Sequence, residues 1–320
     1  MKTWLLYTII GSCAVGVGAG AGVIYKRVIS DPRENIVGFN PDACKPNAEE
    51  LFEKVRKAGS IENATKTLEP FEIVNYSFEK YKACEYSASF CTGLADTTVL
   101  QYIRSGQIRR GNTFFEEQIS KSSMVGVGKR MVQEGVDADT KVYSDTGSSA
   151  VVVDENNAYA TYNAEPQVLS PADYKEAWGR NLPDMAVYLI AKSTVNNQEL
   201  VKEGNGYKVT LNFQPIKGAY NYRNQMKTIS EMDDYPSFSL LDLTYYLDSE
   251  LNIIKMHEHS IFVAHIMGLS PKVENNLDYF YFPNKQMNIP QLSEKFDYQT
   301  LMKEVAKWQK RRNIVFSSGL

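Results

Sequence analysis

Three runs rich in apolar and aromatic residues lie between residues 239 and 282, separated by short polar breaks. The first run alternates apolar and polar positions, which is the period of a strand with one buried face. The break after it contains Asp, Ser and Asn, residues that favour turns. The runs therefore predict three neighbouring strands of one antiparallel meander. These strands are expected at residues 239–247, 253–266 and 277–282.

The apolar side chains of this meander are the candidate ligand-binding residues. In the third run, consecutive aromatic residues fill both faces of the strand, so both faces must be screened from water. Helices that cover one face would leave an apolar pocket against the sheet, and ordinary core packing is the alternative. The candidates are Leu241, Leu243, Tyr245, Leu247, Tyr279 and Tyr281.

The rest of the chain alternates between helix and strand signals. Asn47 is a good helix cap, and the acidic residues that follow it suit the first turn of a helix. Elsewhere, β-branched and aromatic residues between turn signals predict strands. Helices are expected at residues 48–58, 61–68, 122–133, 169–178, 216–232 and 293–311, and further strands at 71–78, 85–95, 98–108, 113–119, 141–143, 150–153, 158–162, 199–202 and 207–213.

Charge and cysteine content exclude several classes of protein. The formal net charge of -3 argues against a nucleic-acid-binding protein, which would carry a basic domain or stripe. An arginine cluster at Arg104, Arg109 and Arg110 is interpreted as the solvated tip of a hairpin in preference to an anion site. Three cysteines outside the leader allow at most one disulfide, so a framework of bridges does not hold the fold together.

An apolar leader opens the chain. Residues 4–25 carry no charge and are flanked by Lys2 and by Lys26 and Arg27. About 20 apolar residues suffice to cross a bilayer as a helix, so this segment is expected to be a transmembrane anchor or a signal peptide. Residues 1–29 then form the leader, 30–46 a linker, and 47–320 a single extracytoplasmic domain held at the cell membrane.

Two cleavage sites are alternatives to an uncleaved anchor. Ala19 and Ala21 fit the small-residue rule of a signal peptidase. Cys13 ends a loose match to a bacterial lipoprotein box, but the apolar run continues beyond it where a lipidated cysteine would be followed by a polar tether. All three interpretations place the body outside the membrane.

The order of elements predicts an α+β fold with a curved antiparallel sheet. Together with residues 51–55, the turn at 248–250 and the tail at 279–290, this order resembles the layout of LolA-like lipoprotein carriers and related bacterial envelope lipoproteins over roughly residues 47–312. The resemblance implies a half-barrel whose concave face is capped by helices and encloses an apolar cavity for acyl chains.

Asp145 begins the string Asp-Thr-Gly-Ser-Ser, the active-site pentapeptide of aspartic proteases. That chemistry needs two carboxylates that share a proton, so a second such loop or a homodimer would have to supply the partner. The sequence contains no second copy. An ordinary hairpin turn is therefore the favoured interpretation, and an aspartic-type hydrolase is the lesser alternative.

His257 and His259 are expected on one face of a strand, since they are two positions apart. Such a pair can begin a zinc site, with His265 or an acid from a neighbouring strand as a third ligand. Exposed strand residues near a sheet edge are the favoured alternative. No cofactor is expected.

These observations predict a non-enzymatic, membrane-tethered cell-envelope protein that binds a lipid or another apolar ligand between sheet and helices. The alternative is a surface interaction or structural module with the same fold and a filled core. The sequence favours neither an oligomeric state nor a particular ligand.

Overall fold

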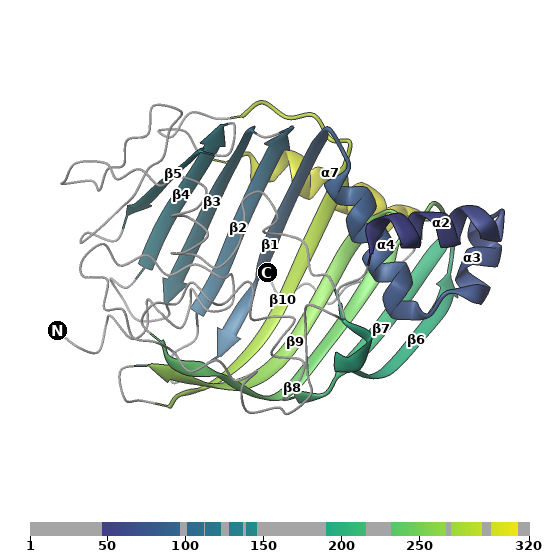
Figure 1. Cartoon of the computed structure of the whole chain (residues 1–320). Helices are drawn as coiled ribbons and strands as arrows, with labels where there is room; N and C mark the ends of the chain where they lie inside the picture. The colour runs from purple at the N-terminus through teal and green to yellow at the C-terminus, as the bar shows by residue number, and fades with distance from the viewer. Residues whose placement is uncertain are drawn as a thin grey trace.

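An open antiparallel sheet of ten strands forms most of the described structure, a computed structural model (Figure 1). The structure describes residues 47–96, 101–111, 113–122, 128–136, 139–145, 190–215, 232–266, 270–289 and 296–312. The strands are β1 (Tyr86–Asp96), β2 (Gln101–Arg110), β3 (Thr113–Ser122), β4 (Gly128–Val136), β5 (Asp139–Asp145), β6 (Val195–Glu203), β7 (Gly206–Phe213), β8 (Met232–Leu247), β9 (Ile253–Ile266) and β10 (Lys272–Pro283). With its few helices, this sheet makes the fold α+β, as the sequence predicts.

The predicted meander is confirmed as β8, β9 and β10, which are neighbours in the sheet. The turn between β8 and β9 closes because the carboxylate of Asp248 accepts hydrogen bonds from the backbone N–H groups of Glu250 and Asn252. Leu251 takes a positive φ of 58° inside this turn. The chemistry of five adjacent residues therefore fixes the register of the longest hairpin.

The last strand, β10, pairs with the first strand, β1, and this joins the two halves of the sheet. The strand order is β5-β4-β3-β2-β1-β10-β9-β8-β7-β6. Phe90 lies opposite Phe280 in this pairing, and their rings stack at 4.8 Å between centroids. The middle of the sheet is thus made by residues about 190 positions apart, which local sequence patterns do not reveal.

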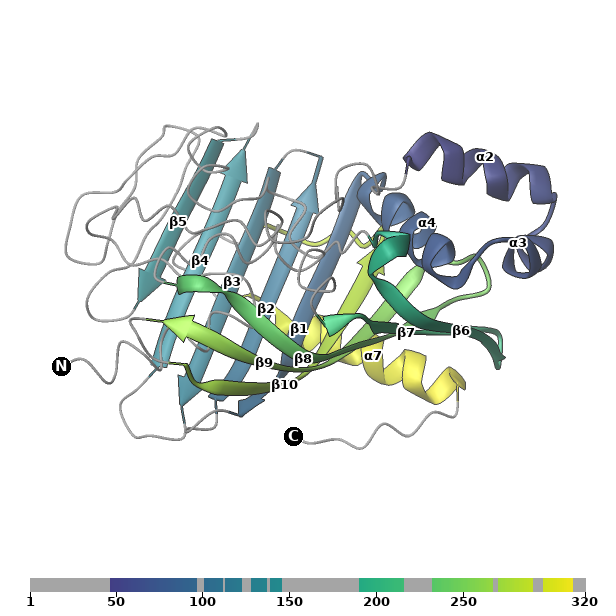
Figure 2. The ribbon, with the colours of Figure 1, turned by 60° about the horizontal axis from the view of Figure 1, so that its bottom comes forward.

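Helices lie on both faces of the sheet (Figures 1 and 2). One face, named the α4 face, is defined by the buried Tyr245, Met256 and Tyr279 and is contacted by α4. The other, named the α7 face, is defined by Phe90 and Phe280 and is covered by α7. The helices are α2 (Ala48–Ala58), α3 (Ile61–Thr67), α4 (Pro70–Lys82) and α7 (Tyr298–Arg312), with a short 3-10 turn η3 (Lys192–Thr194).

The expectation that the helices share one concave face is wrong for α7. The apolar stripe of α7 includes the buried Leu301 and the partly buried Val305, which pack against the aromatic residues of β1 and β10. Because consecutive aromatics on β10 point to both faces, each face needs its own cover. The α7 helix provides it on the side opposite α4.

The prediction of a strand at residues 71–78 is also wrong, since these residues belong to α4. Pro70 stands at the start of the helix, and Glu69 and Glu72 form a capping box. Every residue from Ile73 to Glu79 is buried, so this stretch shows no alternation between a buried and a solvent-exposed side. Aromatic and β-branched residues then mislead a prediction based on periodicity.

The other predicted elements include a helix that is confirmed, one that is wrong and several that lie outside the described residues. The helix at 48–58 is confirmed as α2, with the side chain of Asn47 accepting from the backbone N–H groups of Glu49 and Glu50. The helix expected at 122–133 is wrong, because its second half lies in β4. The elements expected at 150–153, 158–162 and 169–178 lie outside the described residues, as does the helix expected at 216–232 except for its last residue, which begins β8.

Candidate functional site

The six candidate ligand-binding residues come together on the α4 face, as their spacing predicts. Tyr245 of β8 and Tyr279 of β10 both lie opposite Met256 of β9, one on each side. All six side chains are buried. The sheet therefore brings these residues together in one buried apolar surface.

Helix α4 fills the space above one end of this surface. The Phe78 ring meets the rings of Tyr245 and Tyr281 edge to face, at 6.0 and 5.6 Å, and Tyr81 meets Tyr281 at 5.3 Å. Such aromatic contacts are typical of a packed core. At this end of the face, the filled-core alternative describes the side chains well.

Further along the same face, polar side chains are buried where the pattern predicts only apolar ones. Glu258 and Ser260 of β9 are fully buried, and the Ser260 hydroxyl donates to the Glu258 carboxylate at 2.7 Å. The hydroxyl of Tyr279 donates to the second carboxylate oxygen at 3.3 Å. Burial raises the pKa of the neighbouring Cys91 thiol well above its ordinary value, and the charge of the Glu258 carboxylate contributes in the same direction. This thiol is therefore a protonated, inert core group.

Asn275 of β10 is the most unusual member of this buried polar group. Its side chain is fully buried, and among the residues that the structure describes neither its oxygen nor its nitrogen has a hydrogen-bond partner. In the ladder it lies between Ser260 of β9 and Ala95 of β1, and its neighbours Val273 and Leu277 point to the same face. The predicted strand began at 277 and so missed Asn275. Its burial is seen only in the structure, where buried and less buried positions alternate from residue 272 to 279.

The two histidines lie on the α7 face and share it, as predicted. The Nδ1 atom of His257 lies 2.9 Å from the Asp278 carboxylate, and the Nε2 atom of His259 lies 2.9 Å from that of Glu274. Each imidazole thus has its own carboxylate partner. Within the described part of the chain, no group of three or more potential ligands is placed to hold a metal ion.

Lys255 is buried beside His257. Its ammonium group lies 2.8 Å from the Asp278 carboxylate and faces the rings of Tyr246 and Phe280. Burial lowers the pKa of Lys255, whereas the Asp278 charge acts to raise it. Asp278 therefore contacts both His257 and Lys255, and its charge compensates this buried ammonium.

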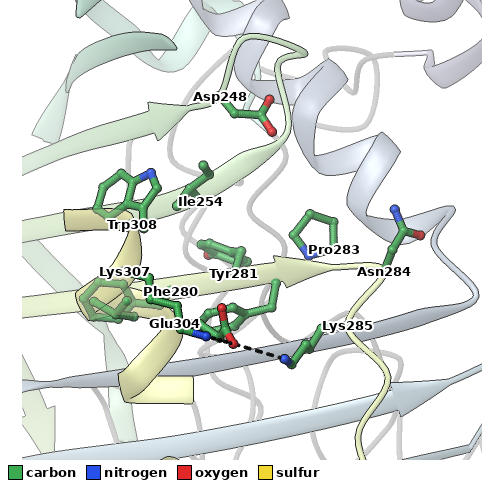
Figure 3. Close-up of a pocket in the computed structure, with 12 residues that line it drawn as sticks. Asp248, Ile254, Phe280, Tyr281, Pro283, Asn284, Lys285, Glu304, Lys307 and Trp308 are labelled. Carbon is green, nitrogen blue, oxygen red and sulfur yellow. Dashed lines mark hydrogen bonds and ion pairs between the residues drawn. The ribbon is translucent and has the colours of Figure 1, made fainter. Parts of the chain in front are cut away.

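A pocket of about 270 Å³ opens between α7 and the ends of β9 and β10 (Figure 3). Trp308 and Glu304 reach it from the helix, and Lys285 closes it from the segment after β10. Its lining comprises Asp248, Ile254, Phe280, Tyr281, Phe282, Pro283, Asn284, Lys285, Glu304, Val305, Lys307 and Trp308. Of the six predicted ligand residues, only Tyr281 borders it.

The interpretation of the arginine cluster as a solvated tip is wrong for Arg104 and Arg109, whereas Arg110, beside the β2–β3 turn, is exposed. Arg109 is part-buried, and its guanidinium donates to the backbone carbonyls of Tyr81, Lys82 and Cys84 at 2.8–3.0 Å. Arg104 lies over the Tyr298 ring at 4.7 Å. These two side chains hold the end of α4 and the start of α7 against the sheet, which a hairpin pattern in the sequence does not indicate.

Several predicted residues fall where the structure describes little or nothing. Asp145 is the last residue of β5 and lies opposite Arg130, while residues 146–149 are outside the described part. Cys13 and residues 4–25 are outside it as well. Among the helices that the structure does describe, none has the length and apolar character needed to cross a bilayer.

Comparison with known proteins names no family for this chain. No protein-family model matches the sequence, and no curated protein matches it significantly. Function must therefore be argued from the residues themselves.

Proposed function

We propose that the protein is a membrane-tethered cell-envelope protein without catalytic activity, which binds a lipid or another apolar ligand on the α4 face of its sheet. In this proposal the sheet is the half-barrel of the LolA-like layout, and residues 4–25 hold the body on the outer side of a membrane. An open sheet with a long, buried apolar face supports it.

The observation that carries the proposal is the unpaired side chain of Asn275. A buried donor or acceptor without a partner costs about 1–3 kcal/mol, and an amide contributes one of each kind. Natural cores seldom contain such a group unless a ligand, an ion or a water molecule supplies the missing hydrogen-bond partner. A leucine of similar size would fit a purely structural core at this position better.

The surroundings of Asn275 indicate what kind of ligand would satisfy it. Val273, Leu277 and Phe262 are fully buried apolar neighbours on the same face. A ligand with an apolar body would contact these residues. An ester, amide or hydroxyl group on that ligand would hydrogen bond with the Asn275 side chain.

The alternative is an interaction or structural module with a filled core. It is favoured by the close packing of Phe78 and Tyr81 on Tyr281 at the α4 end of the face. In that case Asn275 has no role beyond the core, and neither the wild type nor an Asn275 variant should carry a bound ligand.

The experiment is native mass spectrometry and thermal unfolding of the full-length protein with Asn275→Leu. The matched control is Asn276→Leu, at the adjacent, exposed position on the other face. Wild type and Asn276→Leu should retain a bound apolar molecule, whereas Asn275→Leu should lose it. After delipidation, Asn275→Leu should melt at a higher temperature than the ligand-free wild type, since it removes an unpaired amide. A wild-type protein without ligand would favour the filled-core module, and an Asn275→Leu variant that keeps the ligand would exclude Asn275 as its contact.

Localisation needs a separate test. N-terminal sequencing of the protein from cells would distinguish an uncleaved anchor from cleavage after Ala21 or before a lipidated Cys13. Protease added to intact cells or spheroplasts should digest the body. Digestion only after lysis would contradict the extracytoplasmic placement.

A further inference from the structure

The pocket beside α7 lies on the opposite face from the proposed ligand surface and has its own chemistry. Its floor and walls are apolar and largely aromatic, with Phe280 and Phe282 from β10 and Val305 and Trp308 from α7. Its volume of about 270 Å³ equals about nine waters at ~30 Å³ each. That is enough for one short aliphatic chain and lies at the lower limit for small-molecule sites.

The mouth of this pocket carries two ammonium groups that converge on one point. Lys285 and Lys307 both lie near Oε1 of Glu304, at 3.5 and 3.1 Å (Figure 3). The fourth charged residue of the lining, Asp248, accepts hydrogen bonds from the backbone N–H groups of its own turn. Two cations thus share a single carboxylate at the edge of an apolar pocket.

Glu304 shows where an anion fits. Its hydrogen bond with Lys307 and the positive charge of Lys285 outweigh the effect of burial and lower the pKa of Glu304, so the carboxylate is ionised at neutral pH. The two lysines therefore already bind one carboxylate at this place. An anion carried in by a ligand would find the same two donors and would compete with Glu304 for them.

We propose that this pocket binds an anionic amphiphile, an aliphatic chain that ends in a carboxylate or phosphate. The chain lies against Phe280, Phe282 and Trp308, and the head group accepts hydrogen bonds from Lys285 and Lys307. Both a free fatty acid and a phospholipid of the surrounding membrane have this chemistry. The site is independent of Asn275, because the two lie on different faces and share no residue.

Calorimetric titration of octanoate into the full-length protein in phosphatidylcholine nanodiscs tests this site, with empty nanodiscs as the blank. Octanoate should bind once per chain. Lys307→Met and Lys285→Met should each weaken its binding about tenfold, the range of a hydrogen bond to a charged group. The matched control is Lys303→Met, an exposed lysine of α7 outside the pocket, which should bind as wild type does.

Two further variants separate the charge from the apolar contact. Glu304→Gln removes the competing carboxylate and should tighten octanoate several-fold while leaving octanol unchanged. Val305→Trp fills the pocket and should abolish binding of both compounds. Titration in nanodiscs with phosphatidylglycerol then distinguishes a free fatty acid from a membrane phospholipid as the ligand. Unchanged octanoate binding indicates a free acid. Lost octanoate binding indicates that the phospholipid occupies the pocket.

Three results would overturn this assignment. Octanoate could fail to bind to the wild type. Lys303→Met could weaken binding as much as Lys307→Met, which would indicate nonspecific attraction to a basic helix. Glu304→Gln could leave the affinity for octanoate unchanged, which would exclude the two lysines as the head-group site.

Discussion

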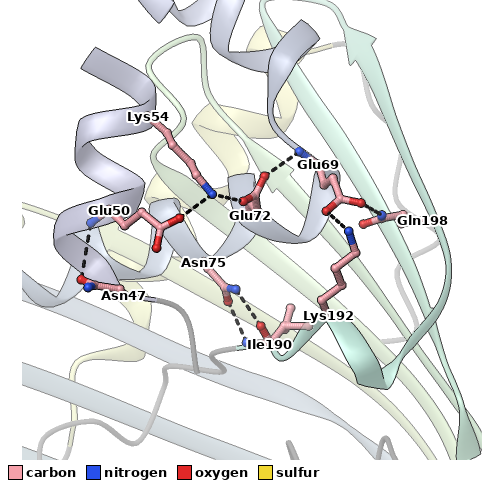
Figure 4. A network of polar contacts seen from close by, with 9 residues as sticks. All are labelled: Asn47, Glu50, Lys54, Glu69, Glu72, Asn75, Ile190, Lys192 and Gln198. Carbon is pink, nitrogen blue, oxygen red and sulfur yellow. Dashed lines mark hydrogen bonds and ion pairs between the residues drawn. The ribbon is translucent and has the colours of Figure 1, made fainter. Parts of the chain in front are cut away.

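The side-chain amide of Asn75, in the middle of α4, exchanges two hydrogen bonds of 2.7 Å with the backbone of Ile190 (Figure 4). Its nitrogen donates to the Ile190 carbonyl, and its oxygen accepts from the Ile190 N–H. Both residues are buried. One amide thus satisfies a donor and an acceptor of the segment that enters β6, 115 positions further along the chain.

Substitution of Asn75 should therefore be costly. Asn75→Ala leaves the donor and the acceptor of Ile190 unpaired and is expected to lower the free energy of unfolding by about 2–4 kcal/mol. Asn75→Asp should cost at least as much, since a carboxylate cannot donate to the carbonyl. Urea denaturation followed by circular dichroism measures both.

The control for Asn75 is Lys192→Ala. It breaks the ion pair of 2.6 Å between Lys192 and Glu69, which fastens the same segment to α4 from the exposed side (Figure 4). Exposed pairs contribute about 0–1 kcal/mol, so this variant should resemble the wild type. Equal losses from both variants would show that the segment is held by its surface charges and not by the buried amide.

Arg109 should be irreplaceable by lysine. Its guanidinium donates to the carbonyls of Tyr81, Lys82 and Cys84, and its Nε donates to the Ser87 hydroxyl at 3.2 Å. A lysine lacks this planar set of donors, so Arg109→Lys should lower the free energy of unfolding by about 2–3 kcal/mol. The same change at the exposed Arg110 should have little effect, and a similar loss at both positions would argue against the capping role.

Stability at low pH should depend on Asp278. Burial acts to raise its pKa, but the hydrogen bond from His257 and the charge and hydrogen bond of Lys255 prevail, so the pKa of Asp278 in the folded protein lies below its ordinary value of 3.8. The stabilisation is complete above that value and is lost as the pH falls through the folded-state pKa. Asp278→Asn should lower the free energy of unfolding at neutral pH. Below about pH 4, the free energy of unfolding of this variant should fall less steeply with pH than that of the wild type.

A second variant tests the source of this pKa. Lys255→Met removes the charge and the hydrogen bond of Lys255 that lower this pKa, so acid unfolding should begin at a higher pH than in the wild type. Lys272→Met, at an exposed position of the same strand as Asp278, serves as the control. Acid unfolding curves that coincide for Lys255→Met and wild type would exclude Lys255 as the partner that lowers the pKa.

Gly106 should not tolerate a side chain. A Cβ atom placed there would lie 2.5 Å from the buried ring of Phe296, well inside van der Waals contact. Gly106→Ala should therefore cost about 1–3 kcal/mol through overpacking. The double variant with Phe296→Leu should recover part of that loss in a thermal melt, and strictly additive losses would contradict this contact as the cause.

Much of the secondary structure follows from the sequence. Asn47 caps α2 and Asp248 closes the β8–β9 turn, and both act on residues within four positions of themselves. The alternation from Leu241 to Leu247 identifies a buried face of β8 without any knowledge of its neighbours. Period and turn chemistry are local, so these elements are predictable.

The candidate site is less predictable. Leu243 and Tyr279 share a face, as alternation requires, but whether a helix or a ligand covers them depends on segments far away in the chain. The buried Asn275 gives no signal in its own neighbourhood, because Asn is a common turn residue. The lysines of the α7 pocket are 22 positions apart and are brought together only when α7 packs against the end of β10.

The sequence by itself determined the strand meander, the helix caps and the apolar character of both faces of β10, because each depends on interactions over a few residues. The tertiary structure alone decided that residues 71–78 form a helix, that α7 covers the second face and that Arg109 caps α4. In these cases burial against distant strands outweighs local propensity, since most of the free energy that stabilises a helix or strand comes from the surface it packs against.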